Sequence, residues 1–362
     1  MKILGIESSC DETAASVVED GRILHSFVVQ TQIDIHKQYG GVVPEVAARS
    51  HIEVINPVIN QALTEAGCDW DDIDAIAVTY APGLIGSLLV GTLAARTLAI
   101  IHRKPLYPIH HVEAHVYANF ITEKRESGVN SLSNLSFPSK QPTFPMLALI
   151  VSGNHSNLVL FRNHGDYELL GQTQDDAVGE AFDKVAKIIG LPYPGGPSIA
   201  KAALDGDPQK YTLPKARLDN PYNFSFSGLK TALLRTVQRE TGHDYTFPSH
   251  ELPRLLNDVQ RANFAASFQR TAIETLVDKT ERAFRDYTPT SVVIAGGVAA
   301  NQELRRQLSK RLPIIIEYAP MQLCTDNGAM IAALGYYVAQ KKNPVDPYEL
   351  EVVPSLSMTK TA

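Results

Sequence analysis

Two copies of one local pattern, one at the N-terminus and one beginning at Met146, constrain the fold of this sequence most strongly. In each copy an apolar run enters a loop of small polar residues, and two further β-rich runs follow, separated by Gly and Asp turns. Such runs are typical of antiparallel hairpins. The first copy has runs 2–6, 14–18 and 23–29 with loop 8–13, and the second has runs 146–151, 157–161 and 167–173 with loop 152–156. The repeat predicts two similar lobes whose polar loops clamp a phosphorylated ligand, the alternative being chance repetition of a common meander.

A second pair of matching segments supports the duplication. A strand at 75–79 leads through Pro82-Gly83 into a helix that ends near Ile101, and a strand at 291–295 leads through Gly296-Gly297 into a helix. A helix that begins just after a Gly turn leaves backbone N–H groups free for a phosphate, although many α/β proteins contain this arrangement without a ligand. The periodicity of apolar residues predicts further helices at 176–189, 257–287 and 328–338, the last one capped by Thr325-Asp326.

Composition is that of an ordinary soluble globular protein, with 44% apolar and 20% charged residues. The net charge of -6 gives no general attraction to nucleic acid, so a tRNA or DNA contact would need a local basic patch or a helper subunit. Three widely spaced cysteines and the lack of a signal peptide indicate a cytoplasmic protein. The most apolar stretch, 85–101, includes Arg96 and is expected to be a buried helix rather than a membrane span.

The sequence also suggests where the lobes begin and end. Residues 122–144 are rich in Ser, Asn and Pro. They are expected to form a surface linker, either ordered or disordered. The expected N-terminal lobe is 1–121 plus 326–340, the C-terminal lobe is 145–325, and the Pro-containing tail 341–362 is expected to be peripheral.

The strongest chemical signal is the segment from His110 to His115. If this segment is helical, His111 and His115 lie on one face about 6 Å apart, which suits a shared metal ion. The alternative is a pair of hydrogen-bonded or surface histidines without a metal. A zinc protease would need Glu directly after the first His, but that position is Val112, and Glu113 lies about 200° around the helix from His111.

A third metal ligand is needed, and Asp326 is the best candidate. It precedes a predicted helix, so the alternative is a simple N-cap aspartate, and the two roles are compatible. Two imidazoles and one carboxylate leave coordination positions open, which suits a substrate-binding metal better than a closed structural site.

Several residues of the second half are candidates for ligand contacts. The loop 152–156 offers backbone amides and hydroxyls at a strand end, although it also fits a plain hairpin turn. Asp183 lies on a predicted helix, where a carboxylate is usually solvated. If Asp183 faced a cleft, it would instead hold a ribose or an amino group. Gly196, in a rigid Pro-Gly-Gly-Pro turn, leaves room for a ligand near the backbone.

Taken together, these segments resemble the tRNA N6-adenosine threonylcarbamoyltransferase family, formerly described as O-sialoglycoprotein endopeptidases. The resemblance covers roughly residues 1–121 and 145–340. The motifs that carry it occur in this order: Gly5-Ile6-Glu7-Ser8-Ser9-Cys10-Asp11-Glu12-Thr13, Gly41-Val42-Val43-Pro44-Glu45, His111-Val112-Glu113-Ala114-His115, Ser152-Gly153, Gly179-Glu180-Ala181-Phe182-Asp183-Lys184, Tyr193-Pro194-Gly195-Gly196-Pro197, Phe224-Ser225-Phe226-Ser227-Gly228-Leu229-Lys230, Gly296-Gly297-Val298-Ala299-Ala300-Asn301 and Cys324-Thr325-Asp326-Asn327.

The resemblance implies an α/β, two-lobe actin/Hsp70-like fold, with duplicated ribonuclease H-like domains and a cleft between them. It implies transfer of threonylcarbamoyl from its adenylate to N6 of adenosine 37 in tRNAs that read codons beginning with A. It also implies one divalent metal, iron or alternatively zinc, on His111, His115 and Asp326, and bacterial partners comprising a degenerate paralogue and a P-loop ATPase. The residues that it implies for adenylate binding are Ile150, Val151, Ser152, Gly153, Asn154, Asp183, Gly196 and Asn301.

One departure from the family pattern bears on the site. The chain has Ser152-Gly153-Asn154-His155-Ser156 where the family pattern is Ser-Gly-Gly-His-Thr, so Asn154 places a Cβ near a bound ligand unless its backbone is left-handed. The activated donor needs no protein nucleophile, and Asp11 and Glu12 are the candidates for the base. An actin-fold kinase or ATPase and a zinc metalloprotease remain as alternative functions.

Overall fold

The computed structural model describes residues 1–125 and 135–359, which form two compact units. The first comprises Met1–Thr143, Asn163–Asp166 and Glu317–Ala362, and the second comprises Phe144–Arg162 and Tyr167–Ile316. The chain therefore returns to the first unit at Glu317, earlier than the expected residue 326, and Asn119 fixes this return because its side chain accepts a hydrogen bond from the Ala319 amide (3.1 Å). Part of the expected linker, 126–134, lies outside the described residues.

The first unit is built on a seven-stranded sheet of order β6-β5-β1-β2-β3-β7, with β4 also paired to β2. Its strands are β1 (Lys2–Glu7), β2 (Glu12–Glu19), β3 (Ile23–Leu24), β4 (Val28–Thr31), β5 (Ala75–Ala81), β6 (Leu106–His110) and β7 (Glu123–Lys124). The expected strand 23–29 is split in two, because the His25 and Ser26 amides both donate to the Val17 carbonyl and interrupt the pairing.

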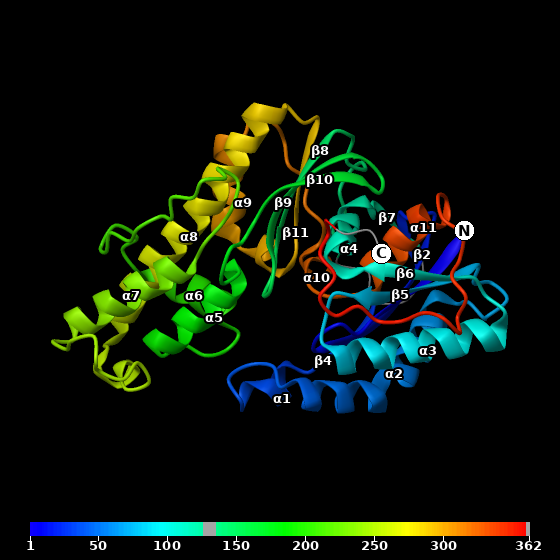
Figure 1. The fold of residues 1–362 in the computed structure, drawn as a ribbon, viewed down its shortest axis with the longest axis horizontal. Helices are drawn as coiled ribbons and strands as arrows, with labels where there is room; N and C mark the ends of the chain where they lie inside the picture. Colours follow the sequence, from blue (N-terminus) through cyan, green and yellow to red (C-terminus); the bar gives the residue numbers. More distant parts are fainter. Residues whose placement is uncertain (126–134, 360–362) are drawn as a thin grey trace. The chain divides into compact units, whose positions relative to one another are not determined.

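Helices cover both faces of this sheet (Figure 1), with α2 and α3 on one face and α11 on the other. The helices are α1 (Ile33–Lys37), α2 (Pro44–Ala66), α3 (Ile85–His102), α4 (His111–Tyr117), α10 (Met321–Cys324) and α11 (Gly328–Ala339). Leu4 and Ile6 of β1 join the core beneath α2. Between them, Gly5 faces α11, where a Cβ would lie 2.2 Å from the Gly328 carbonyl oxygen, so α11 packs directly on the β1 backbone.

Helix α3 is only half buried, so its prediction as a buried helix is wrong for one of its faces. Leu88, Gly91, Ala95 and Ala99 are buried. The opposite face exposes large apolar side chains, comprising Ile85, Leu89, Leu93, Ile100 and Ile101. Helix α3 is long and apolar enough to cross a membrane, as core helices of soluble proteins can also be.

The C-terminal tail is an integral part of the first unit rather than peripheral. Arg96 on α3 donates to the carbonyl oxygens of Pro347, Tyr348 and Leu350. Leu350 also enters the core of the unit. Backbone hydrogen bonds join the tail to strands of the sheet, from Val345 to Leu106 and from Val353 to Tyr80.

The second unit repeats the pattern of the first. Its sheet has the order β10-β9-β8-β11, formed by β8 (Met146–Val151), β9 (Ser156–Asn163), β10 (Asp166–Gln172) and β11 (Ser291–Ala295). β8 lies between antiparallel β9 and parallel β11, just as β1 lies between antiparallel β2 and parallel β5. The duplication predicted from the sequence is therefore confirmed by the strand pairing.

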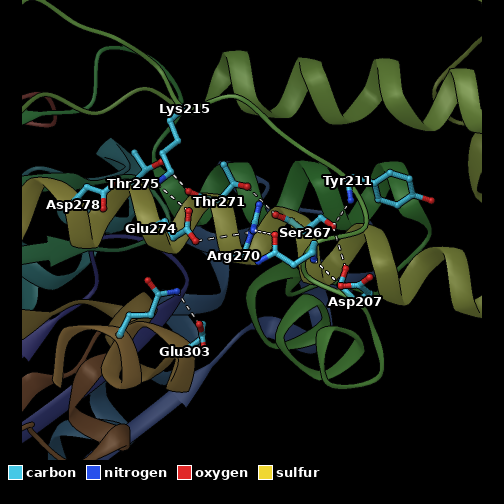
Figure 2. Close-up of polar contacts among 12 residues, drawn as sticks. Asp207, Tyr211, Lys215, Ser267, Arg270, Thr271, Glu274, Thr275, Asp278 and Glu303 are labelled. Atoms are coloured by element: carbon cyan, nitrogen blue, oxygen red, sulfur yellow. Dashed lines mark hydrogen bonds and ion pairs between the residues drawn. The ribbon is translucent and has the colours of Figure 1, made fainter. Parts of the chain in front are cut away.

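The helices of the second unit are α5 (Val178–Ile189), α6 (Gly195–Ala202), α7 (Ser227–Glu240), α8 (Asp258–Tyr287) and α9 (Gln302–Arg311). The long helix α8 begins at a capping box formed by Asn257 and Gln260. Figure 2 shows that the irregular segment from Asp207 to Lys215 lies beside α8 and makes polar contacts with it. The Tyr211 amide donates to the Ser267 hydroxyl (3.2 Å), and Lys215 pairs with Glu274 (3.0 Å) and Asp278 (2.8 Å).

Candidate active site

The predicted histidine helix is present as α4, which follows directly on β6. His110 ends the strand, and its Nδ1 accepts a hydrogen bond from the Glu113 amide (3.4 Å), which caps the helix. Its Nε2 contacts the Leu356 carbonyl oxygen (3.3 Å), and burial lowers the pKa of His110 to about 4. His110 is therefore a neutral cap rather than a metal ligand.

The next turn brings His111 and His115 together. Both side chains are buried, and their ring centroids lie 4.7 Å apart with the planes nearly perpendicular. The i, i+4 spacing thus places the two imidazoles on one face of the helix, as predicted from the sequence.

Asp326 completes this cluster from the opposite end of the chain. The expectation that Thr325-Asp326 caps the last helix is wrong, because Asn327 is the N-cap of α11 and accepts from the Met330 amide (3.0 Å). The Asp326 carboxylate instead faces the histidines, with Oδ1 3.6 Å from His111 Nε2 and 3.3 Å from His115 Nε2. One ligand atom from each of the three residues lies within 4.8 Å of the others.

The donor set fits a divalent cation. Both ring nitrogens of His115 are buried, and neither has a hydrogen-bond partner among the residues that the structure describes. An unpaired buried polar atom is costly, and a bound cation would provide the missing partner. Two imidazoles with one carboxylate are ligands that zinc accepts and that non-haem iron sites also use.

A second carboxylate lies behind His111. Glu7 is fully buried at the end of β1, and its Oε2 lies 3.0 Å from His111 Nδ1. Burial alone would lower the pKa of His111, but the Asp326 and Glu7 carboxylates raise it to about 9 when no cation is bound. Burial likewise opposes ionisation of Glu7, yet the neighbouring imidazolium and its hydrogen bond hold the Glu7 pKa below its usual value.

The two candidates for the base lie where the loop after β1 enters β2: Asp11 ends the loop and Glu12 is the first residue of β2. Asp11 is buried, and its backbone carbonyl accepts from the Gln32 amide (3.0 Å). Burial, with added repulsion from Asp326 and Asp11, raises the pKa of Glu12 well above its usual value and favours its uncharged form. Glu113, which helix geometry excludes as a protease base, lies near Tyr80, whose pKa is raised by burial and by this carboxylate.

In the second unit, the loop after β8 is held against the start of α5. Ile150 and Val151 are buried at the strand end, and the carbonyls of Ser152 and Gly153 accept hydrogen bonds from the amides of Gly179 (3.2 Å) and Glu180 (3.0 Å). The Ser152 amide is used in the turn, where it donates to the His155 carbonyl (2.9 Å). Within the described ranges the Gly153 and Asn154 amides have no acceptor, so these two remain available to an anion.

Asn154 does not adopt the left-handed conformation. Among the described residues, the non-glycine residues with positive φ are Asp20, Arg103 and Thr288. The Asn154 side chain is exposed, and a Cβ added to Gly153 would meet no atom within 4 Å, so the loop is open on this side.

The remaining predicted contacts lie around the same end of the second sheet. Gly296, with a φ of +86°, lets the end of β11 approach Val151, since a Cβ there would lie 2.5 Å from the Val151 oxygen. Asn301 follows as the N-cap of α9 and donates to Gln269 Oε1 (3.0 Å). The carboxyl ends of adjacent parallel strands are a usual place for ligands in open α/β sheets.

Asp183 shapes the turn that contains Gly196. Its Oδ1 accepts a hydrogen bond from the Gly195 amide (2.6 Å), and Gly195 packs on the α5 backbone. A Cβ on Gly196 would meet open space, as the prediction of a close ligand approach requires. The structure thus groups the metal-ligand candidates in the first unit and the nucleotide-contact candidates in the second.

No sequence pattern indicates the role of Glu7. It lies in the quoted N-terminal motif directly after an apolar run, and a polar residue fully buried at a strand end is the feature that marks it in the structure. Its partners Thr79 and His111 are distant in sequence, so only the fold brings them together.

Fold and site together define a class: a duplicated α/β protein of the actin/Hsp70-like fold with a histidine-carboxylate cluster in its first unit. A solved structure titled full-length HypF in the phosphate- and nucleotide-bound form has the same fold, with a TM-score of 0.55 and 13% identity over 94% of this chain and 47% of that chain. At this level of identity the likeness concerns the fold alone.

The chain belongs to the tRNA N6-adenosine threonylcarbamoyltransferase family, whose family model matches residues 23–333. A relative with this name from Thermomicrobium roseum is 51% identical, covering 94% of this chain and 93% of the relative. Another with this name from Bacillus subtilis is 44% identical, covering 99% and 96%.

Proposed function

We propose that this protein transfers the threonylcarbamoyl group from threonylcarbamoyl-adenylate to N6 of adenosine 37 in tRNAs that read codons beginning with A, and releases AMP. The observation that carries the proposal is the convergence of His111, His115 and Asp326 in a member of this family. Near-full-length relatives at up to 51% identity in this comparison carry the same transferase name.

His111, His115 and Asp326 would hold one divalent cation, iron or alternatively zinc. When bound, such a cation supplies a Lewis acid that orients the donor and polarises oxygens that gain negative charge. A cation would bind His115 Nε2, which is buried and faces Asp326 (3.3 Å) without a hydrogen bond in the described part of the chain.

The second unit would bind the adenylate. The Gly153 and Asn154 amides would hold its phosphate or carboxylate, with Ile150, Val151 and Ser152 fixing the loop at the end of β8. Asp183 and Asn301 would hold the adenosine end, and open space above Gly196 would let the ligand approach the backbone.

The reaction needs no covalent enzyme intermediate, because the donor is already a mixed anhydride. The N6 amine attacks the carbamoyl carbon, a C–N bond forms, the C–O bond to the phosphate breaks, and the amine loses one proton. Asp11 and Glu12 are the candidates for accepting that proton. Because its raised pKa favours the protonated form, Glu12 would need its charge environment to change before it could act as a base.

A kinase or a metalloprotease would account for fewer features of the histidine-carboxylate cluster. A kinase or ATPase would have no use for the buried His111–His115 pair. A protease would need an ionised base beside the metal, but Glu7 is hydrogen-bonded behind His111, and the raised pKa of Glu12 favours its uncharged form.

The direct test is a transfer assay. Purified protein is mixed with threonylcarbamoyl-adenylate and unmodified tRNA, with and without partner proteins, and modified nucleoside and AMP are quantified. Equal amounts of modified nucleoside and AMP support the proposal. ATP hydrolysis or peptide cleavage without modified tRNA, under all partner combinations, would overturn it.

We further propose that the protein is cytoplasmic and acts with a degenerate paralogue of the same fold and a P-loop ATPase. The support for the paralogue is the exposed apolar face of α3, formed by Ile85, Leu89, Leu93, Ile100 and Ile101. Contiguous apolar surface of this kind marks interaction sites, and a matching helix face on a protein of the same fold would cover it. The three free cysteines agree with a reducing compartment.

A further inference from the structure

We infer that Glu7 is a positioning residue that orients His111 toward the metal. The inference rests on the proposed function in one respect, namely that His111, His115 and Asp326 hold a cation. Glu7 is not itself a ligand, because it contacts the far side of the His111 ring from Asp326.

Three donors converge on the two oxygens of Glu7. Oε1 accepts from the Ser9 amide (2.5 Å), and Oε2 accepts from the Thr79 hydroxyl (2.6 Å) and from His111 Nδ1 (3.0 Å). Glu7 itself has 0% exposure, so these bonds are made without competition from water. Ser9, in the loop after β1, and Thr79, in β5, therefore hold the carboxylate in place independently of His111.

His111 Nδ1 contacts both Glu7 Oε2 (3.0 Å) and the Ser9 hydroxyl (3.1 Å), and of these two groups the carboxylate can only accept, so it favours a proton on Nδ1. With Nδ1–H donating to Glu7, Nε2 is the nitrogen directed at Asp326, 3.6 Å away. Ligating histidines are commonly held in this way by a carboxylate behind the ring, which fixes the tautomer and increases ligand basicity.

His115 provides an internal contrast. Neither of its nitrogens has a hydrogen-bond partner in the described part of the chain, so no such anchor fixes its ring. The two ligands therefore differ: Glu7 contacts His111 behind the ring, whereas the polar neighbour of His115 is Asp326, on the side of the cation (3.3 Å).

A purely structural role for Glu7 predicts different results. If Glu7 served only to join β1 to β5, its replacement would lower stability without changing the metal site. Glu7→Gln separates the two roles, because an amide presents one acceptor and one donor group where three donors now meet. Whichever way the amide is turned, at least one of the three donors faces its NH₂ group, so the set of acceptors that orients His111 is disrupted.

The experiment measures zinc affinity of the full-length protein by competition with a fluorescent chelator. E7Q is expected to bind Zn²⁺ about 10–100-fold more weakly than the wild-type protein. Thr79→Val, which removes one donor but keeps the carboxylate, is expected to weaken binding by a smaller factor. Thr92→Val is the matched control, because its buried hydroxyl bonds to Leu88 within α3 and lies outside this network.

Nitrogen NMR of histidine-labelled, zinc-loaded protein gives a readout that a merely structural role would not change. The Nδ1–H signal of His111 is expected in wild type and T92V, and is expected to shift or disappear in E7Q. Zinc affinity within twofold of wild type together with an unchanged Nδ1–H signal in E7Q would overturn the inference. If E7Q does not fold, T79V decides in the same way.

The two proposals fail differently. A wild-type protein that retains no zinc contradicts the metal site on which the proposed function depends. A wild-type protein that binds zinc, with E7Q and T79V binding equally well, removes only the positioning role of Glu7.

Discussion

His110, His111 and His115 lie on one helix and its cap, yet each imidazole has different surroundings. His110 is neutral because it is buried against backbone groups, with a pKa of about 4. His111 lies between two carboxylates that raise its pKa to about 9 despite burial. His115 has no hydrogen-bond partner in the described ranges. Residue type alone therefore does not determine the role of a histidine here.

The raised pKa of His111 predicts how the metal-stripped protein responds to pH. Because the folded state binds this proton more tightly than the unfolded state, the stabilisation is complete below pH 6.5 and is lost as pH rises through about 9. The loss amounts to at most about 3 kcal/mol. Urea unfolding of metal-stripped protein across this window should show the decline, and His111→Gln should remove it. The same decline in H111Q would contradict this assignment.

At the residue scale, sequence spacing identified the histidine pair, and chemistry singled out Asp326 as a third ligand candidate. The role of Asn327 as the N-cap was missed, because Thr, Asp and Asn are all good caps and stand side by side. Glu7 was missed because its contact with His111 joins positions 104 residues apart. Contacts of this length depend on strand order, which a single sequence does not reveal.

At the scale of elements, helix α11 is positioned by the glycines that let it lie on β1. Gly5 faces the Gly328 carbonyl and the Ala332 amide, and Gly328 lies two residues beyond Asp326. The close approach of β1 and α11 therefore also fixes the position of Asp326, which lies just before α11.

Gly5→Ala should consequently destabilise the first unit and disturb the metal site. A Cβ 2.2 Å from a backbone oxygen forces α11 away, and overpacking of this kind costs about 1–3 kcal/mol. Urea unfolding followed by circular dichroism should show this loss, together with weaker zinc binding. Gly228→Ala is the matched control, because its Cβ would meet no atom within 4 Å. Equal stability of the two variants would contradict the packing account.

The apolar face of α3 makes a separate prediction about the paralogue. The double change Leu89→Glu and Leu93→Glu adds two charges to side chains that are 43% and 53% exposed, so the fold should be retained. Association with the paralogue, measured by titration calorimetry, should weaken at least about tenfold, the equivalent of about 1.4 kcal/mol. Val259→Glu, on α8, should have no effect. Unchanged association of the α3 variant would remove α3 from the interface.

Element types and most boundaries follow from periodicity, since α5, α8 and α11 form where apolar residues recur at helical spacing. The exposed face of α3 could not be foreseen, because a helix that is apolar all round has no pattern that separates core from surface. The split of the third strand likewise depends on two amides that share the Val17 carbonyl, a local detail without a sequence signature.

At the scale of the whole molecule, duplication is the feature that the sequence conveyed best. Each unit has its first strand between an antiparallel and a parallel neighbour, and the candidates for metal and nucleotide binding divide between the units. The docking of the tail has no sequence signal, because the groups of the tail that Arg96 binds are backbone carbonyls.

This division predicts that the two binding functions can be lost separately. Asn301→Ser keeps a good N-cap for α9 but removes the side-chain amide, so AMP binding should weaken while zinc binding is unchanged. His115→Ala should lose zinc and keep AMP binding. Calorimetry with each ligand checks both variants. Loss of both ligands in either single variant would contradict separate sites.

A cation held by His111, His115 and Asp326 is expected to be required for transfer. Metal content and single-turnover formation of modified tRNA are determined on the same samples of wild type and of the double variant His111→Ala and His115→Ala, with circular dichroism to verify folding. Wild type should contain one metal ion per chain and carry out transfer, and the folded double variant should do neither. Full transfer by a metal-free double variant would contradict it.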